Sequence, residues 1–321
     1  MAEYKGIKGF KVQSLASDPT ANVGQIWYNT TSNTLKYDSI AAGAWASGGA
    51  ANTGRRYMSI AGTQSSAVTC GGSPPPITAT EQYNGTAWTA HPGGTLNSDK
   101  HNWGGLGQSD SAAMAVGGSG YLDISETWNG TIWTEGTNIQ TGRTFNSAAG
   151  TTTSAILTLG ETPGSPNTVK TEEWNGTSWS EVNNINTPGY LTGHSTDASA
   201  QAAWMVAGGS GRGVKTETYD GTSWTEVNGL SRSSPTASAM GSSGSSTACL
   251  VFGGFTSVSA LTEVWDGTSW TEVADLATAR YGPGGCGSST LALCSMGATP
   301  ATTTVTEEWS TPAVVKTVTV S

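Results

Sequence analysis

The segment Thr171-Glu-Glu-Trp174-Asn-Gly-Thr-Ser-Trp179 recurs along this chain at a nearly constant interval. The second tryptophan of the segment recurs every 45 or 46 residues, at Trp88, Trp133, Trp179, Trp224 and Trp270. The first aromatic residue occurs six times, at Tyr83, Trp128, Trp174, Tyr219, Trp265 and Trp309. A period near 45 residues built from strand-like pieces is typical of a β-propeller, in which each repeat forms one small sheet. We therefore expect an all-β fold with six blades.

Two further marks place the strands within each repeat. An apolar run ends in Gly-Gly or a remnant of it at 70–72, 116–118, 159–161, 207–209, 252–254 and 295–297, which predicts six second strands. A glutamate two residues before the first aromatic predicts six third strands, at Glu81, Glu126, Glu172, Glu217, Glu263 and Glu307. Weaker patterns predict first strands, for example over 57–61, 146–150 and 236–240.

Asn-Gly or Asp-Gly lies between the two aromatics of each repeat, for example Asn84-Gly85. These dipeptides tolerate positive φ at both centres of a type I′ turn, so they predict a two-residue hairpin in which Tyr83 faces Thr86. Strand alternation then puts Glu81 opposite Trp88 on one face of the sheet. Asn84, Asn129 and Asn175 also match the N-glycosylation pattern, but the repeat favours the turn interpretation.

The chain divides by pattern into an N-terminal segment, 1–48, and a propeller, 49–321. The N-terminal segment contains a predicted hairpin over 25–29 and 34–37, and we expect it to attach the propeller to a larger assembly. The candidate attachment residues are Phe10, Ile26, Trp27, Tyr28, Leu35 and Tyr37. The last blade is irregular, and two closures are open: its outer strand is either 314–320 or the stretch containing Trp45.

Composition excludes some classes of partner. The net charge of −9 and only 14 scattered Lys and Arg residues argue against nucleic acid. The N-terminus lacks the apolar core of a secretory signal, and no run reaches transmembrane length, so synthesis in a cytoplasm is expected without membrane insertion. The four cysteines lack metal-ligand spacing and are predicted to be reduced and buried.

Features present in every repeat are assigned to the fold. The six glutamates are expected to accept structural hydrogen bonds, and the separated His91, His101 and His194 predict no metal and no cofactor. Function is expected on the face formed by the loops between second and third strands and between blades, because these loops vary. Candidate ligand-binding residues on that face are His101, Trp103, Tyr121, Arg143, Tyr190, Arg212, Phe255 and Tyr281.

Two resemblances extend this interpretation. Gly-Gly followed by an aromatic and a tryptophan, over roughly 50–310, is similar to the kelch repeat. The leader, 10–37, the repeated Trp-Asn-Gly-Thr-Ser-Trp and the ending 316–321 resemble structural proteins of tailed, particularly marine, bacteriophages. This resemblance implies a non-enzymatic virion component, as a tail fibre, tail-associated or capsid-decorating protein present in several copies.

The partners implied by the resemblance are other virion proteins, contacted through the N-terminal segment, and a host-surface glycan. Two alternatives stay open: a carbohydrate-active enzyme, such as a sialidase-like hydrolase, and an intracellular kelch-like scaffold. The resemblance favours the virion component.

Overall fold

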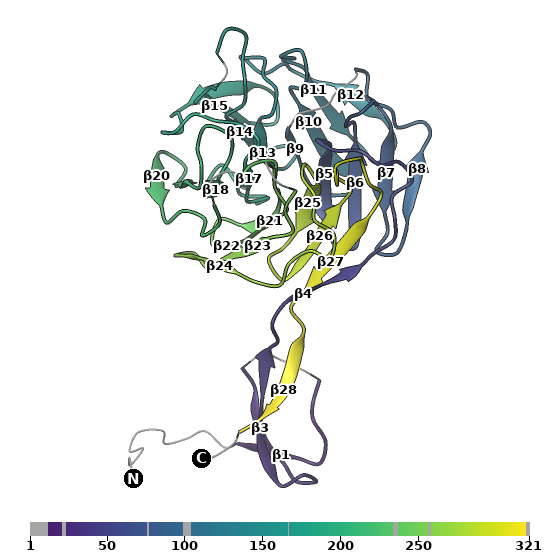
Figure 1. Cartoon of the computed structure of the whole chain (residues 1–321), viewed down its shortest axis with the longest axis vertical. Helices are drawn as coiled ribbons and strands as arrows, with labels where there is room; N and C mark the ends of the chain where they lie inside the picture. Colours follow the sequence, from purple (N-terminus) through teal and green to yellow (C-terminus); the bar gives the residue numbers. More distant parts are fainter. Residues whose placement is uncertain are drawn as a thin grey trace. The chain divides into compact units, whose positions relative to one another are not determined.

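The computed structural model of this chain describes residues 12–20, 24–75, 77–98, 104–165, 167–233, 237–255 and 258–318. Every regular element in these ranges is a β-strand, and the strands form seven four-stranded sheets (Figure 1). The predicted all-β class is confirmed. The expected count of six sheets is wrong, because the N-terminal hairpin is part of a seventh complete sheet. No helix in the described ranges is long and apolar enough to cross a membrane.

The chain forms two compact units, one of Ala44–Ser310 and one of Met1–Gly43 together with Thr311–Ser321. The larger unit holds six of the seven sheets. In strand order they are β5 (Ser59–Thr63), β6 (Ser66–Cys70), β7 (Thr80–Tyr83), β8 (Trp88–His91); β9 (Gly104–Ser109), β10 (Ala112–Val116), β11 (Ser125–Trp128), β12 (Trp133–Glu135); β13 (Ser147–Gly150), β14 (Ala155–Thr158), β15 (Thr171–Trp174), β16 (Trp179–Val182); β17 (Gly193–His194), β18 (Trp204–Ala207), β19 (Thr216–Tyr219), β20 (Trp224–Val227); β21 (Gly241–Ser245), β22 (Ala248–Phe252), β23 (Thr262–Trp265), β24 (Trp270–Glu272); and β25 (Gly284–Gly287), β26 (Leu291–Ser295), β27 (Thr306–Ser310), β4 (Ala44–Ser47).

These six sheets form a closed ring around a common centre (Figure 1). Each innermost strand contacts the innermost strand of the next sheet, in the order β5, β9, β13, β17, β21, β25 and back to β5. Six apolar clusters each lie between two neighbouring sheets, and a seventh, with Ala239, Tyr281 and Ala298, joins more than two. In the first, for example, Tyr83 and Trp88 pack with Leu293 and Met296. Each sheet therefore buries its faces only against its neighbours, as the repeat predicts.

The repeated tryptophans also join the sheets by hydrogen bonds. Trp88 Nε1 donates to Thr306 Oγ1 of the preceding sheet at 3.0 Å, and Trp133 Nε1 donates to Thr80 Oγ1 at 2.9 Å. A buried indole N–H needs an acceptor, and the threonine at the start of a third strand supplies it for Trp88, Trp133 and Trp270. Trp224 Nε1 instead donates to the Asn183 carbonyl at 3.1 Å, and Trp179 Nε1 has no hydrogen-bond partner among the described residues. The predicted second and third strands are present in all six sheets of the ring.

The ring is closed by the N-terminal strand, which decides between the two closures. β4 pairs antiparallel with β27, with Trp45 directly opposite Trp309, and Trp45 Nε1 donates to Thr262 Oγ1 at 3.1 Å. The C-terminal strand β28 (Ala313–Thr317) instead pairs with β3 (Thr34–Ile40) in the smaller unit. The expected propeller range, 49–321, thus omits one strand of the ring and includes one strand of the other unit.

The predicted two-residue turns are wrong. Tyr83 pairs with Trp88 rather than Thr86, so the hairpin has a four-residue loop, and Ala90 rather than Trp88 lies opposite Glu81. The Asn84 side chain accepts hydrogen bonds from the backbone N–H groups of Thr86 and Ala87, at 3.0 and 2.9 Å, so only Gly85, at φ 89°, enters the left-handed region. The two aromatics therefore face each other directly, with ring centroids 5.0 Å apart.

The smaller unit contains a single sheet in the order β1 (Gln13–Leu15), β2 (Ile26–Asn29), β3 and β28. Trp27 is fully buried on one face, where its Nε1 donates to Asp18 at 3.2 Å and Lys36 forms an ion pair with the same carboxylate at 2.8 Å. Ile26 and Tyr28 lie on the opposite face and are 54% and 37% exposed. Phe10 lies outside the described residues.

Candidate ligand-binding site

Five residues at equivalent positions surround the centre of the sheet ring, each two residues before the innermost strand of its sheet. They are Tyr57, Phe145, Leu191, Ala239 and Gly282, with φ of 53°, 56°, 55°, 51° and 59°. Backbone hydrogen bonds join them in order: Leu191 N to Phe145 O, Ala239 N to Leu191 O, Gly282 N to Ala239 O, and Tyr57 N to Gly282 O. The left-handed region costs a residue other than glycine roughly 1–2 kcal/mol.

This geometry explains why the first strands were predicted too early. The innermost strands begin at Ser59 and Gly241, whereas the patterns predicted 57–61 and 236–240. The left-handed residues Tyr57 and Ala239 interrupt the extended backbone just before each strand. The apolar pattern therefore runs through a bend that the sequence does not mark with glycine.

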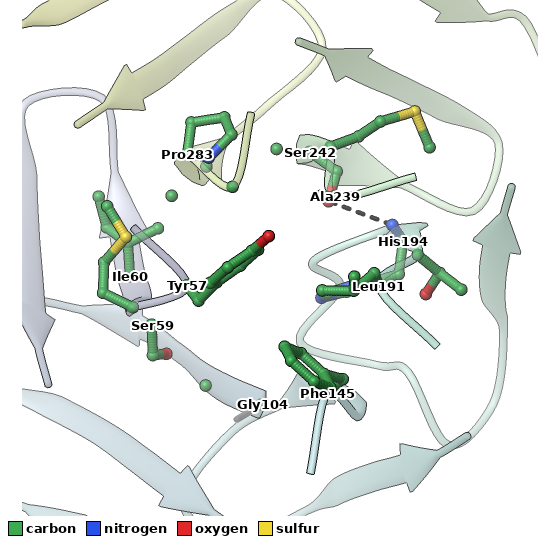
Figure 2. Close-up of a pocket in the computed structure, with 18 of the residues that line it drawn as sticks. Tyr57, Ser59, Ile60, Gly104, Phe145, Leu191, His194, Ala239, Ser242 and Pro283 are labelled. Atoms are coloured by element: carbon green, nitrogen blue, oxygen red, sulfur yellow. Dashed lines mark hydrogen bonds between the residues drawn. The ribbon is translucent and has the colours of Figure 1, made fainter. Parts of the chain in front are cut away.

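Aromatic side chains gather over the same end of the ring, and Figure 2 shows Tyr57 and Phe145 projecting toward its centre. Ring centroids lie 5.7 Å apart for Tyr57 and Phe145, 5.7 Å for Phe145 and Tyr190, 6.2 Å for Tyr57 and Tyr281, and 4.8 Å for Phe255 and Tyr281. We call these five residues the aromatic mouth. Their spacing is that of packed aromatic pairs, and Phe255 is 43% exposed.

Arg56 adds a cation to the aromatic mouth. Its guanidinium carbon lies 5.3 Å from the centroid of Tyr57 and 5.1 Å from that of Tyr281, and its Nη1 donates to the Tyr281 hydroxyl. Arg56 Nε is buried without a hydrogen-bond partner among the described residues. Burial raises the pKa of Tyr57, against the opposing effect of the Arg56 charge, so the tyrosine stays protonated.

A cavity of about 110 Å³ lies at the centre of the ring, and Tyr57 and Phe145 are part of its wall. Glycines form much of the remaining wall, at Gly104, Gly105, Gly241, Gly284 and Gly285. Asn146 and His194 also belong to the lining, and Figure 2 labels His194. Burial lowers the pKa of His194 to about 4, so its imidazole is neutral at neutral pH. We call this space the central cavity.

The structure brings three of the predicted ligand-binding residues together and separates others from them. Tyr190, Phe255 and Tyr281 belong to the aromatic mouth, whereas Tyr121 is exposed and has no ring contact with it among the described residues. The contact between Phe255 and Tyr281 joins the two loop classes that were expected to share one face. His101 and Trp103 lie outside the described residues.

Arg143 and Arg212 do not face solvent, which corrects their placement on the variable face. Arg143 is fully buried and forms an ion pair with Glu172, and Arg212 forms one with Glu217 at 3.1 Å. A buried glutamate needs compensation for its lost hydration, and a buried arginine supplies it. These two arginines hold the fold rather than a ligand.

The same arrangement recurs around the ring. Arg55, Arg232 and Arg280 pair with Glu81, Glu263 and Glu307, so five of the six arginines of the sequence are buried against repeat glutamates. All six glutamates accept hydrogen bonds from the backbone N–H groups of a neighbouring loop; the donors are those of Asn52, Asn97, Gln140, Asn186, Ser231 and Ala277. The predicted structural role of the glutamates is confirmed.

Sequence reasoning missed Tyr57, Phe145, Arg56, Asn146 and His194 as site residues. A correct register for the first strands would have aligned Tyr57 with Phe145, but glycine occupies this position only at Gly282. Within the described ranges, no group of three or more His, Cys, Asp and Glu side chains is placed to hold a metal ion. The cysteines, Cys70, Cys249, Cys286 and Cys294, are all buried and free, as predicted.

The comparisons with known proteins bear on the fold alone. No protein-family model matches the sequence, and no curated protein matches it. The structure reported as "Structure of YjhT" is similar to this chain, with a TM-score of 0.66 and 11% sequence identity, over 83% of this chain and 99% of that one. The fold is a β-propeller. At this level of identity the likeness carries no information on activity or ligand.

Proposed function

We propose that this chain is a non-enzymatic structural protein of a tailed-phage virion, whose propeller binds a host-surface glycan at the aromatic mouth. Six of the seven sheets act as blades, of a kelch-like type, and the remaining sheet attaches the propeller to another virion protein. The phage assignment is supported by the sequence resemblance of the leader, the repeats and the C-terminal end. The glycan assignment is supported by the geometry of the mouth.

The observation that carries the binding function is the pair Tyr57 and Phe145 in left-handed conformation. The equivalent positions hold Ala239 and Gly282, so the backbone ring forms without an aromatic side chain. Leu191 and Ala239 share this left-handed backbone, and what distinguishes Tyr57 and Phe145 is that the conformation directs an aromatic ring into the mouth. Flat aromatic surfaces beside hydrogen-bonding groups suit a sugar, whose C–H face packs on the ring while its hydroxyls are bound.

Binding at the mouth is tested with Tyr57→Gly and Phe145→Gly, because glycine keeps the left-handed backbone and removes only the ring. Both variants should fold and lose at least tenfold in affinity for purified host-surface polysaccharide, measured by isothermal titration calorimetry. Tyr121→Ala is the matched control, since it removes an exposed aromatic outside the mouth. Unchanged affinity in both glycine variants would refute the proposal.

The attachment function is supported by the exposed apolar face of the smaller unit. Ile26 and Tyr28 are exposed there, and Leu35 and Tyr37, half-buried, pair with them on the same face. Ile26→Asp should reduce incorporation into particles, detected by mass spectrometry of purified virions. Thr317→Asp, on the opposite face of the same sheet, should not. Equal incorporation of both variants would argue against this face, and absence of the wild-type protein from particles would overturn the virion assignment.

No specific observation favours the carbohydrate-active enzyme. A sialidase-like hydrolase needs clustered, accessible arginines, whereas five of the six arginines are buried in structural ion pairs. Among the described residues, none that lines the central cavity carries a carboxylate. The site therefore offers aromatic rings and neutral polar groups, which suit sugar binding, but lacks the paired carboxylates that acid–base hydrolysis needs.

A further inference from the structure

We propose that Arg56 and the tyrosine hydroxyls beside it form an oxyanion site, so that the glycan bound at the aromatic mouth is an acidic one. This inference rests on the proposed glycan-binding function and adds the charge class of the ligand. It is carried by an arginine without a carboxylate partner in the described part of the chain, and by the contact of that arginine with two rings of the mouth.

Arg56 differs from the other five arginines of the chain in its surroundings. Those five are buried, and each forms an ion pair with a repeat glutamate. Arg56 is half-buried and has no ion pair among the described residues. An arginine keeps its positive charge in a folded protein, and a charge partly removed from water attracts an opposite charge more strongly than one in open solvent. Arg56 therefore favours an anion at the mouth.

One edge of the Arg56 guanidinium remains available to a ligand. Its Nε is buried, and its Nη1 donates to the Tyr281 hydroxyl. Its Nη2 has no hydrogen bond to a described residue and, unlike Nε, is not buried. A guanidinium forms its strongest hydrogen bonds with oxyanions, because both partners are charged. We therefore assign Nη2 as the atom that receives the oxyanion.

Tyrosine hydroxyls supply further donors around Arg56. The Tyr281 hydroxyl accepts from Arg56, which leaves its own proton for another acceptor. Tyr57 and Tyr190 are half-buried, and neither hydroxyl has a hydrogen bond among the described residues. Burial raises the pKa of Tyr57, the Arg56 charge opposes this effect, and the Tyr190 phenol raises the pKa further, so Tyr57 stays protonated. A carboxylate, sulfate or phosphate accepts hydrogen bonds only, which matches this set of donors.

The backbone holds Arg56 and Tyr57 in place. Arg56 exchanges two backbone hydrogen bonds with Ser73, at 2.9 and 3.0 Å, and Tyr57 N donates to the Gly282 carbonyl at 3.0 Å. An added Cβ at position 282 would lie 2.9 Å from the Tyr57 ring, so glycine there leaves room for the ring beside Tyr281. Groups that are fixed before binding lose less entropy when a ligand arrives.

The charge lies next to the aromatic surface, which suits an acidic sugar unit. The Arg56 guanidinium carbon is 5.3 Å from the centroid of Tyr57, and that centroid is 5.7 Å from the centroid of Phe145. Figure 2 shows both rings directed toward the centre of the ring of sheets. A sugar packed on these rings has room to place a carboxylate or a sulfate ester at the edge of Arg56, whereas a neutral sugar leaves the Arg56 charge uncompensated.

The test compares three sugars that differ only in the group on the exocyclic carbon, using the full chain. The probes are methyl glucoside, methyl glucuronide and the sulfate ester of methyl glucoside at its primary hydroxyl, and NMR titration measures the affinities. At least one acidic probe should bind about tenfold more tightly than methyl glucoside, and high ionic strength should reduce this preference. The probe that is preferred identifies the oxyanion as a carboxylate or a sulfate.

Substitutions assign the preference to Arg56. Arg56→Gln should abolish the preference for the acidic probe, and Arg56→Lys, which keeps the charge but loses the planar fork, should retain part of it. Lys215→Gln is the matched control, because it removes the same charge from an exposed ion pair with Glu226. A preference that survives in Arg56→Gln, or that Lys215→Gln reduces equally, overturns the inference.

Chemical modification tests the site in the wild-type chain, which keeps the test valid should Arg56→Gln fail to fold. Phenylglyoxal should modify Arg56 before the five buried arginines, and peptide mass spectrometry locates the label. The preferred acidic probe should protect Arg56, and methyl glucoside should not. Absence of modification at Arg56, or equal protection by the two probes, overturns the oxyanion site.

The outcomes separate this inference from the proposed function. If Tyr57→Gly loses polysaccharide binding while the wild-type chain binds acidic and neutral probes equally, the oxyanion site is wrong and the aromatic mouth is retained. If an acidic probe binds through Arg56 but host-surface polysaccharide does not bind, the oxyanion site is retained and the proposed function is wrong. If none of the three probes binds, the oxyanion site is wrong, and the mouth is judged by its own experiment.

Discussion

Trp45 lies directly opposite Trp309 across the pairing of β4 with β27, with ring centroids 5.5 Å apart. This pair occupies the same place in its sheet as Tyr83 and Trp88 in theirs, although one partner comes from each end of the larger unit. The last sheet is therefore completed by a strand from the start of the chain. Closure of this kind leaves no open interface between the first and last sheets of the ring.

The closure predicts that two nearby truncations behave differently. A fragment of residues 44–310 keeps β4 and should unfold cooperatively, whereas a fragment of residues 49–310 lacks β4 and should unfold at a temperature lower by 10 °C or more. The reason is the loss of the outer strand and of the partly buried Trp45, which packs on Phe252 and Trp309; removing a fully buried aromatic typically costs about 3–5 kcal/mol, and the lost strand pairing adds to the smaller cost here. Differential scanning calorimetry measures both, and equal melting temperatures would contradict closure by β4.

Arg143→Met should destabilise the fold by about 3–5 kcal/mol, because it leaves Glu172 buried without its counter-ion. Urea unfolding at neutral pH gives the change in free energy. Glu181→Gln is the control: it breaks an exposed ion pair with Lys170 at 3.1 Å and should change stability by about 0.5 kcal/mol or less. Similar effects of the two substitutions would show that burial is not what makes the Arg143 pair important.

Tyr57→Gly should be more stable than Tyr57→Ala by about 1 kcal/mol. Both changes remove the aromatic ring, but only alanine retains a Cβ that is strained at φ 53°. This order reverses the usual advantage of alanine over glycine in folded proteins. Thermal and urea unfolding of the two variants measure the difference, and an alanine variant that is the more stable would disprove strain at this position.

The pH dependence of stability should contain a component from His194. Above its ordinary pKa of 6.5 the ring is neutral in both the folded and unfolded chains and contributes no pH dependence. Between pH 6.5 and about 4, only the unfolded chain takes up the proton, because burial lowers the folded-state pKa to about 4; the free energy of unfolding therefore falls as pH falls.

His194→Phe should remove that component. The difference in unfolding free energy between wild type and His194→Phe should be constant above pH 6.5 and should change between pH 6.5 and 4. Urea titrations at half-unit intervals of pH measure it. A difference that stays constant over the whole range would show that the folded chain binds the proton as readily as the unfolded chain.

The cysteines should not react in the folded protein. Burial raises the pKa of Cys249 and Cys286 far above the ordinary value and that of Cys294 to about 12, so the reactive thiolate is scarce as well as inaccessible. A thiol reagent such as dithionitrobenzoate should find no reactive group under native conditions and four after denaturation. Rapid native labelling would indicate local opening of the sheets.

The repeat alone was sufficient to predict the all-β class, the second and third strands and the structural role of the glutamates. These features depend on local pattern: alternation, the period and the residues next to each turn determine them within one sheet. Local pattern also predicted the wrong turn type. The Asn84 side chain accepts hydrogen bonds from the backbone of its own loop, and Asn84 does not adopt the positive φ that the predicted type I′ turn requires.

Only the tertiary structure decided what closes the ring, what neutralises the glutamates and where the site lies. Trp45 pairs with Trp309 although the two lie near opposite ends of the larger unit. Arg212 and Arg143 lie in different kinds of loop, yet each forms an ion pair with a repeat glutamate, Glu217 and Glu172. No fixed spacing along the chain predicts these contacts. The aromatic mouth likewise joins Tyr57, Phe145 and Tyr281 from three sheets around one centre. The sequence by itself determined the sheets; the closed ring, by packing each sheet only on its neighbours, decided which distant side chains meet.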